Sequence, residues 1–355
     1  MNILVLAPEN LSLTGGNVYE SHFYNTLKKI SNHKIEFCES KKYDDGFSFL
    51  KLFFPFLEIK LLKIIKTKDI CFWNSTSAYR HFILLIAVRI FYPKIKVYVF
   101  HHHYQFELME GIKKNIFKFF EVNFLRFATS IIIPSPYVLK KTKELLPNKK
   151  VNYIEIAFDN NVSVKKTFEM TRQLLYVGTI EFRKGLHLLI DVLSQLKKDN
   201  NKFTINIVGS IVDTRYYKEL LEKVAFYGLE EQVFFRGRLP LEEMRNYFLK
   251  ADIFVFPSLL EGFGMVIMEA MSYGIPVIAF DNTAMPFIIK HDYNGFLVKN
   301  KDLPDFKIKI ENVLNNVSLR EKLSKGASET FANSRRPPEF IKDINNFINN
   351  NALNF

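Results

Sequence analysis

Short runs of β-branched and aromatic residues alternate with helix-like segments along this chain, and this alternation restricts the possible folds more than any other feature. In the first part of the chain the strand-like runs are NILVLAP (2–8), KIEFCES (34–40), DICFWN (69–74), KVYVF (96–100), ATSIIIPS (128–135) and VNYIEIAF (151–158). Loops and helix-like segments separate these runs. Because strands that are joined through helices lie parallel in one sheet, the pattern predicts an α/β fold.

A polar stretch at 160–171 separates this block from a second alternating series. The strand-like runs of the second series are QLLYVGT (173–179), FTINIVGS (203–210), QVFFRGR (232–238), DIFVFPS (252–258), PVIAF (276–280) and NGFLV (294–298). Two blocks of similar size predict two doubly wound, Rossmann-like domains that face each other across a cleft. Ligands are expected at the carboxyl ends of the strands.

The predicted domain limits are 1–162 and 163–336, followed by a C-terminal helix within 337–355. Two prolines at the start of this last segment precede the helical pattern EFIKDINNFINN. Such a helix either crosses back to the first domain or forms a frayed tail, and we expect it to cross back.

Positive charge is concentrated in the first half of the chain. Residues 1–165 hold 24 Lys and Arg against 14 Asp and Glu, which is +10 of the net +12. A basic half rich in Phe indicates a phosphate-rich partner, which could be a membrane surface, a nucleic acid or a nucleotide ligand. The longest run without a charged residue, 127–139, is too short for a spanning helix, and no signal-peptide pattern opens the sequence. We therefore expect a cytoplasmic protein.

The stretch DIFVFPSLLEGFGMVIMEAMSYGIP (252–276) carries the most chemical information. A buried strand leads into a loop with Glu261 and two glycines, and a helix is expected to begin near Met265. The glycines let backbone amides approach a ligand, and the helix N-terminus directs unpaired N–H groups to the same place. A carboxylate beside such an anion site is favourable when hydroxyl groups donate to it. The stretch predicts a site for a hydroxylated phosphate ester, with a helix-start carboxylate and a solvated Glu269 as the alternative interpretation.

The segment EGFGMVIME places two glutamates eight positions apart, with ADIFVFPS before it and AMSYGIPVIA and NGFLV after it. This pattern resembles the donor-binding signature of glycosyltransferase family 4, whose members are retaining, nucleotide-sugar-dependent enzymes of the GT-B fold. The resemblance continues upstream through VGTIEFRKGLHLLI, INIVGS and VFFRGRLPLEEM, so it covers about 170–300 specifically. It implies a GT-B fold with an N-terminal acceptor-binding domain and a C-terminal donor-binding domain.

The resemblance also implies roles for individual residues. Glu261 would hold hydroxyl groups of the donor sugar, and Glu269 would accept hydrogen bonds from the nucleotide ribose. Lys184, which lies in RKG after a strand, would neutralise the donor diphosphate, so that Lys184 and Glu261 are expected to be catalytic. Many members carry a second cation at the position that Thr179 occupies here, and Arg183 could supply that charge.

The other expected donor contacts lie in loops that follow strands. The resemblance places the loop 262–265 along the sugar and phosphates, Gly209 near the nucleotide phosphate and Arg238 near the base. The complete set of expected donor-binding residues is Gly15, Gly16, Thr179, Arg183, Lys184, Gly209, Arg238, Glu261, Gly262, Phe263, Gly264, Met265 and Glu269.

Three adjacent histidines, His101, His102 and His103, follow the strand-like run KVYVF. The resemblance implies that one histidine at this point faces the donor sugar. We expect His101 to be that catalytic residue, with His102 as the alternative. The pair Gly15 and Gly16 is expected in the loop after the first strand, close to the diphosphate and acceptor.

No metal ion is expected to take part in the reaction. Adjacent extended residues point to opposite faces, so the three histidines do not converge on one ion. The chain contains no D-x-D motif, and its two cysteines, Cys38 and Cys71, lie far apart. We therefore expect no metal and no cofactor, with cationic side chains stabilising the leaving group.

The function most consistent with these motifs is retaining glycosyl transfer from a nucleotide sugar. A UDP-sugar is favoured and a GDP-sugar is possible, and the acceptor would be a hydroxyl of a glycan or lipid-linked molecule in bacterial-type surface polysaccharide or glycolipid assembly. A nucleotide-sugar epimerase of the same fold is an alternative, because fold does not determine function. A basic nucleic-acid-binding protein is a weaker alternative, because no nucleic-acid-binding module is visible.

Two basic, aromatic segments of the first half, 49–68 and 111–128, are predicted to be helices. Helices of this composition can lie in a bilayer interface, although their apolar faces could instead pack on the sheet. We expect the first domain to dock on an anionic membrane surface, which would make the protein peripheral on the inner face of the plasma membrane.

Overall fold

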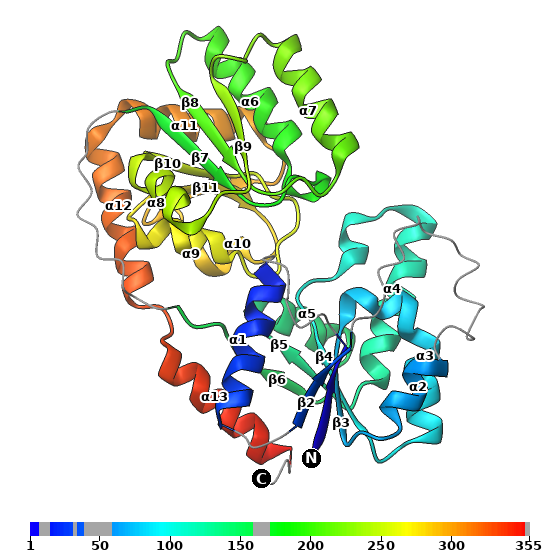
Figure 1. Cartoon of the computed structure of the whole chain (residues 1–355). Coiled ribbons are helices and arrows are strands. Elements are labelled where there is room, and N and C mark those ends of the chain that lie inside the picture. The colour runs from blue at the N-terminus through cyan, green and yellow to red at the C-terminus, as the bar shows by residue number, and fades with distance from the viewer. Residues whose placement is uncertain (7–14, 31–33, 39–58, 159–170, 352–355) are drawn as a thin grey trace. The chain divides into compact units, whose positions relative to one another are not determined.

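The computed structural model describes residues 1–6, 15–30, 34–38, 59–158 and 171–351 (Figure 1). The chain divides into two compact units, which we call unit 1 (residues 1–157 with 335–355) and unit 2 (residues 158–334). The predicted limit between 162 and 163 lies outside the described residues.

Unit 1 is built on a parallel sheet with the strand order β2-β1-β3-β4-β5-β6. Its strands are β1 (Asn2–Val5), β2 (Lys34–Phe37), β3 (Ile70–Asn74), β4 (Lys96–Phe100), β5 (Ser130–Ile133) and β6 (Val151–Tyr153). Its helices are α1 (Gly15–Ile30), α2 (Ile59–Ile65), α3 (Ala78–Phe91), α4 (Gly111–Phe127), α5 (Pro136–Leu145) and α13 (Pro337–Asn350), with short 3-10 turns η3 (Ser75–Ser77) and η4 (Gln105–Leu108).

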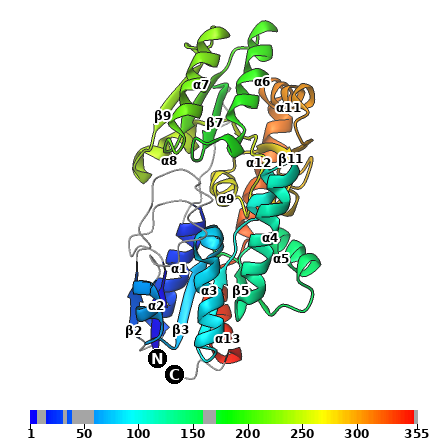
Figure 2. The ribbon, with the colours of Figure 1, turned by 90° about the vertical axis from the view of Figure 1, so that its right-hand side faces the viewer.

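The sheet of unit 1 is covered on both faces, which explains its nearly continuous apolar strands. Every residue of β5 is buried, and so are four of the five residues of β3. On one face, Trp73 stacks on Phe124 of α4, with ring centroids 5.8 Å apart. Figure 2 shows α3 and α4 in front of the sheet and α13 behind it.

The C-terminal helix α13 packs on unit 1, as predicted. The ring of Phe347 lies 5.0 Å from that of Tyr98 and 5.8 Å from that of Phe23. Lys96 Nζ donates to the carbonyl oxygen of Asn351 at 2.6 Å and so satisfies a group that the helix end leaves without a partner. Apolar packing and a cationic C-terminal contact together fix the helix to the sheet.

Unit 2 contains a second parallel sheet, with the strand order β12-β11-β10-β7-β8-β9. Its strands are β7 (Gln173–Val177), β8 (Thr204–Val208), β9 (Val233–Gly237), β10 (Ile253–Phe256), β11 (Val277–Asp281) and β12 (Gly295–Lys299). Its helices are η5 (Phe182–Lys184), α6 (Leu186–Lys198), α7 (Thr214–Phe226), α8 (Leu241–Lys250), α9 (Met265–Ser272), α10 (Met285–Ile288), α11 (Leu303–Asn315) and α12 (Val317–Ala332).

The strand order of unit 2 reverses between β7 and β10. The chain adds β8 and β9 on one side of β7, then returns and adds β10, β11 and β12 on the other. Helices that leave β7 and β10 therefore diverge at the carboxyl edge of the sheet and leave room for a ligand there. The two doubly wound sheets confirm the predicted fold class.

Three local expectations differ from the structure. Strand β6 ends at Tyr153 rather than near 158, because its partner β5 stops at Ile133 before Pro134, which has no N–H to donate. Gly15 and Gly16 begin α1 instead of lying in a loop, since the first helical turn needs no intrahelical N–H bonds. The segment predicted as a helix over 49–68 is helical at α2, and 49–58 lies outside the described residues.

Candidate functional site

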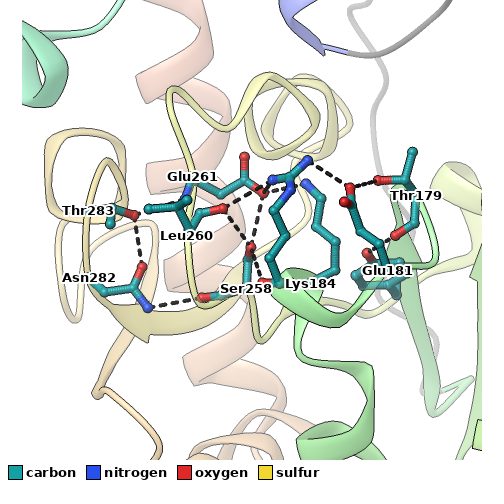
Figure 3. A network of polar contacts seen from close by, with 10 residues as sticks. Thr179, Glu181, Lys184, Ser258, Leu260, Glu261, Asn282 and Thr283 are labelled. Atoms are coloured by element: carbon teal, nitrogen blue, oxygen red, sulfur yellow. Dashed lines mark hydrogen bonds and ion pairs between the residues drawn. The ribbon is translucent and has the colours of Figure 1, made fainter. Parts of the chain in front are cut away.

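Two buried residues of opposite charge meet where the strand order of unit 2 reverses. Lys184 ends η5, directly after β7, and Glu261 lies in the loop after β10. The Lys184 Nζ donates to Glu261 Oε1 (Figure 3). The same Nζ lies 5.2 Å from the ring centroid of Phe256. The structure therefore brings together two residues that are 77 positions apart in the sequence and that the sequence predicted to act on the same ligand.

The two carboxylate oxygens of Glu261 differ in their contacts. Oε1 accepts from Lys184 and from Ser258 Oγ at 3.0 Å, and Arg183 Nη1 lies 3.6 Å from it. In the described parts of the chain, Oε2 has no hydrogen-bond partner, and Figure 3 shows it directed away from the cations. Glu261 thus has one oxygen held by the protein and one oxygen available to a donor group of a ligand.

Electrostatics keeps this pair ionised. Burial alone raises the pKa of Glu261, but the charges of Lys184 and Arg183 and the hydrogen bonds from Lys184 and Ser258 outweigh it and hold that pKa below its ordinary value. Burial lowers the pKa of Lys184, and the carboxylate of Glu261 opposes that effect. The paired charges stabilise each other in a site from which water is largely excluded.

A chain of polar contacts from the loop after β11 supports Glu261. The backbone N–H of Glu261 donates to Thr283 Oγ1 at 3.1 Å, and Thr283 Oγ1 donates to Asn282 Oδ1 at 2.9 Å. Asn282 Nδ2 donates to the carbonyl oxygen of Ser258 at 2.9 Å. Sequence reasoning did not single out these residues, and their only signal is that polar side chains follow strands at the carboxyl edge of the sheet.

Arg183 lies beside Lys184 and is held by its own contacts. Its Nη2 donates to Glu181 Oε1 at 2.8 Å, and its Nη1 donates to the carbonyl oxygen of Leu260 at 3.2 Å. Thr179 Oγ1 donates to the same oxygen of Glu181 at 2.6 Å. The structure therefore provides a second cation next to Lys184, and Glu181, which sequence reasoning missed, connects it to Thr179.

Gly185 allows Lys184 to reach Glu261. It has φ +70°, and a Cβ atom at this position would lie 2.0 Å from the carbonyl oxygen of Pro257. Only glycine fits both the left-handed backbone and the close approach of η5 to the end of β10. The Gly in RKG thus brings the two halves of the site within hydrogen-bonding distance.

Helix α9 begins next to Glu261, at Met265 as predicted. Gly264 precedes it with φ +90° and no side-chain cap, which leaves backbone N–H groups of the first turn available. The loop residues Gly262 and Phe263 are partly exposed, and the Phe263 ring centroid lies 6.1 Å from that of Phe158. This end of the helix has the properties of an anion site.

Glu269 lies one turn inside α9 and is partly buried. Burial raises its pKa to about 7. Its carboxylate has no hydrogen-bond partner among the residues that the structure describes. A partly desolvated carboxylate of this kind is stabilised in its ionised form when a ligand donates hydrogen bonds to it.

Gly209 and Arg238 also lie after strands at the carboxyl edge of this sheet. A Cβ atom on Gly209 would come 1.8 Å from the carbonyl oxygen of Gly178, so the loops after β7 and β8 touch at this point. Arg238 is exposed directly after β9. Neither residue contacts the Lys184–Glu261 pair in the described part of unit 2, and their donor-binding roles stay predictions.

The three histidines of unit 1 lie at the carboxyl end of β4 in different surroundings. His101 is fully buried, its Nδ1 is 2.8 Å from Ser75 Oγ, and burial holds its pKa well below the ordinary value. His102 Nε2 is 2.8 Å from Glu20 Oε1, and a Cβ atom on Gly16 would come 3.1 Å from the His102 ring. Of His101 and His102, the structure thus places His102 against the start of α1, and the expectation for His101 stays a prediction.

In the described residues no three His, Cys, Asp or Glu side chains cluster so that they could hold a metal ion. Metal independence therefore stays a prediction, to be tested by chelation.

Comparison with known protein families gives a match within unit 2. Residues 158–330 match the family model of glycosyl transferases group 1. A Klebsiella pneumoniae protein described as an uncharacterized 41.2 kDa protein in the cps region is 26% identical over 297 residues, 82% of this chain and 73% of that protein. The amylovoran biosynthesis glycosyltransferase AmsK of Erwinia amylovora is 28% identical over 44% of this chain and 40% of its own length.

A solved structure extends the fold comparison to both units. HepE of Anabaena, determined in complex with UDP-glucose, has a TM-score of 0.76 at 19% identity, covering 99% of this chain and 100% of HepE. At this identity the comparison shows the fold alone, which is that of GT-B glycosyltransferases. The match of residues 158–330 to glycosyl transferases group 1 thus lies within a chain of the GT-B fold.

Proposed function

We propose that this protein transfers a sugar, with retention at the anomeric carbon, from a nucleotide sugar to a hydroxyl group of a glycan or lipid-linked acceptor. The observation that carries the proposal is the state of Glu261, with one oxygen held by Lys184 and Ser258 and the other available. A free carboxylate oxygen beside two cations suits a molecule that carries hydroxyl groups next to a diphosphate.

The arrangement favours breakage of the bond between the sugar and a diphosphate. As that bond weakens, negative charge builds on the leaving phosphate, and fixed positive groups stabilise the transition state more than the ground state. Lys184 and Arg183 provide two such groups, and the first turn of α9 provides backbone N–H groups. Glu261 Oε2 would accept from hydroxyls of the sugar, which orients the anomeric carbon.

The similar proteins HepE and AmsK support a UDP-sugar as the donor and a glycan as the product. HepE was solved with UDP-glucose, and AmsK is named for amylovoran biosynthesis. We propose a UDP-sugar as the first choice of donor, a GDP-sugar as the second, and surface polysaccharide or glycolipid assembly as the setting.

A transfer assay with and without acceptor tests this function. UDP- and GDP-sugars are incubated with candidate glycan and lipid-linked acceptors, and proton-coupled NMR of the product's anomeric centre is compared with that of the donor. We expect acceptor-dependent transfer, a retained anomeric configuration and full activity in EDTA. Turnover of the donor sugar to its epimer without any acceptor would instead identify an epimerase.

Glu269 predicts a pH dependence of donor binding. Its pKa of about 7 means that the ionised fraction rises about tenfold between pH 6 and pH 8, and hydroxyl groups donate more strongly to the ionised form. The affinity for UDP-glucose, whose own phosphates do not titrate in this range, is therefore expected to rise up to about tenfold over these two pH units. Calorimetric titration at both pH values measures it.

The matched variant is Glu269→Gln, which keeps the size of the side chain and removes its titration. In this variant the affinity for UDP-glucose should change by less than about twofold between pH 6 and pH 8. An equally steep pH dependence in the variant and the wild type would show that another group is responsible.

We further propose that unit 1 docks on an anionic membrane at the inner face of the plasma membrane. On α4, Ile112 and Phe119 are 79% and 59% exposed, and at 100° per residue they project from nearly the same side of the helix. On the neighbouring α3, Ile90 and Phe91 are exposed as well. No helix in the described residues has the length and apolar composition to cross a bilayer.

The lysine side chains of α4 lie outside the face that Ile112 and Phe119 form, at more than about 90° from it around the helix. Lys113, Lys114 and Lys118 are all exposed near the start of the helix. Each basic residue near an anionic leaflet contributes about 1 kcal/mol, and inserted Phe and Ile side chains add to the affinity. Positive charge beside exposed apolar side chains supports an anionic lipid bilayer as the partner of this surface.

Flotation with vesicles that contain anionic lipid tests the docking. The wild type should float at low salt, and flotation should fall when Ile112 and Phe119 both become Ser or when the three lysines become Glu. The matched control is Phe226→Ser, which changes an exposed Phe on α7 of unit 2 and should leave flotation unchanged. Failure of the wild type to float at low salt would contradict docking and indicate a soluble acceptor.

A further inference from the structure

A buried carboxylate in unit 1 contacts a histidine at the end of the neighbouring strand β4. Glu20, on α1, is 1% exposed, and His102 is 9% exposed. His102 Nε2 lies 2.8 Å from Glu20 Oε1. Burying a charge this deeply costs free energy unless the charge is paired and hydrogen-bonded. The contact with His102 therefore helps to hold α1 against the end of β4.

Asn74 determines which ring nitrogen of His102 carries the hydrogen. The backbone N–H of Thr76 donates to Asn74 Oδ1 at 2.8 Å, and since an N–H can only donate, the other end of the Asn74 amide is Nδ2. This Nδ2 donates to Glu20 Oε1, which is therefore an acceptor. Because an ionised carboxylate oxygen can only accept, the His102 Nε2 in contact with the same oxygen carries a hydrogen and donates it.

The remaining ring nitrogen of His102 is left for a ligand. With Nε2–H directed at Glu20, the neutral ring presents Nδ1 as an acceptor. Nδ1 has no hydrogen-bond partner among the described residues. The ring is enclosed on its other sides by Tyr19, whose centroid is 5.8 Å away, and by Gly16, where any Cβ would crowd it. His101 also has one ring nitrogen in contact with a partner, Nδ1 with Ser75, but its Nε2 is fully enclosed and the whole residue is 0% exposed, whereas His102 keeps some exposure.

We infer that Glu20 is a positioning residue that, together with Asn74, sets the orientation and tautomer of His102 so that Nδ1 meets a sugar hydroxyl of the substrate. This inference rests on the proposed function, and it assigns the substrate contact at the end of β4 to His102 rather than His101. Glu20 itself touches no substrate, since its carboxylate is buried under the ring that it holds.

The first test compares Glu20→Gln with Glu36→Gln. Glu36 is a matched control, because it also lies in unit 1 and pairs with a cation, Lys68, but on the edge strand β2. An amide at position 20 can donate as well as accept, so it no longer enforces one tautomer of His102. We expect kcat to fall at least about tenfold, as when a reacting group is misplaced, while the dissociation constant of UDP stays within about twofold and the control is unchanged.

A double variant separates positioning from a general structural role. If Glu20 acts only through His102, then Glu20→Gln should cost less than about twofold further when it is added to His102→Asn. A kcat of Glu20→Gln within about twofold of the wild-type value would overturn the inference. The inference would also fail if Glu20→Gln lowered kcat in the His102→Asn protein by as much as it does in the wild type.

Histidine-selective ¹⁵N NMR tests the contact without any assay of transfer. The His102 signals, assigned by their loss in His102→Asn, should show Nε2 protonated and Nδ1 unprotonated in the neutral ring, and should change in Glu20→Gln. Unchanged His102 signals in Glu20→Gln would overturn the inference. Should the wild type turn over no nucleotide sugar while the NMR result holds, the proposed function fails and the Glu20–His102 contact stands.

Discussion

Replacing Lys184 by alanine is expected to lower kcat/KM for the nucleotide sugar at least about 100-fold. The Nζ of Lys184 is buried and fixed against Glu261, so in the proposed reaction it would stabilise charge on the leaving diphosphate without having to reorganise. Losses of this size follow the removal of one preorganised group of this kind. Steady-state kinetics with a saturating acceptor measures the effect.

The matched control for this variant is Lys223→Ala. Lys223 also forms an ion pair in unit 2, with Asp191 at 2.7 Å, but on α7 and away from Glu261. Its replacement should leave kcat/KM within about twofold. Melting temperatures of both variants show whether they are folded. If a folded Lys184→Ala protein transfers sugar at a rate near that of the wild type, Lys184 does not stabilise the leaving group.

Glu261→Gln is expected to separate sugar recognition from diphosphate binding. The amide would place an NH₂ group where Oε2 is now free to accept from a hydroxyl, so a hydroxyl of the donor loses its acceptor. A site that hydrogen-bonds a substrate hydroxyl strongly disfavours a complex in which that hydrogen bond is missing. We therefore expect kcat/KM to fall at least about 100-fold. UDP should bind as tightly as before or more tightly, because Lys184 and Arg183 are no longer neutralised by Glu261.

Glu311→Gln controls for the loss of a negative charge in the same unit. Glu311 contacts Lys307 and Asn201 on the surface of unit 2, and its replacement should change neither transfer nor UDP binding. Loss of UDP affinity in a folded Glu261→Gln protein, parallel to the loss of transfer, would mean that Glu261 organises the diphosphate site and does not read the sugar.

The fold and the centre of the site could be predicted from the sequence because they depend on local patterns. Fully apolar runs such as 253–256 indicate strands of a covered parallel sheet, and the order of strands and helices then restricts the topology. Gly264 followed by an apolar helix correctly placed the start of α9 at Met265. The convergence of Lys184 and Glu261 follows from that topology, since both come directly after neighbouring strands.

Features that depend on contacts distant in sequence could not be predicted. Nothing near Glu261 in the sequence indicates that Thr283, 22 positions away, accepts from its backbone N–H. The same holds for His102 and Glu20, which are 82 positions apart. Three adjacent histidines have equal local signals, and only contacts distant in sequence, with Ser75 for His101 and with Glu20 for His102, distinguish their surroundings.

The central claim is that unit 2 binds a nucleoside diphosphate sugar at Lys184 and Glu261, and calorimetric titration with UDP and GDP tests it most directly. The full-length wild type should bind at least one of the two nucleotides, Lys184→Ala should bind that nucleotide at least about tenfold more weakly, and Glu261→Gln should keep or increase the affinity. Absence of binding of both nucleotides by the wild type at millimolar concentration, or equal affinity of wild type and Lys184→Ala, would contradict the claim.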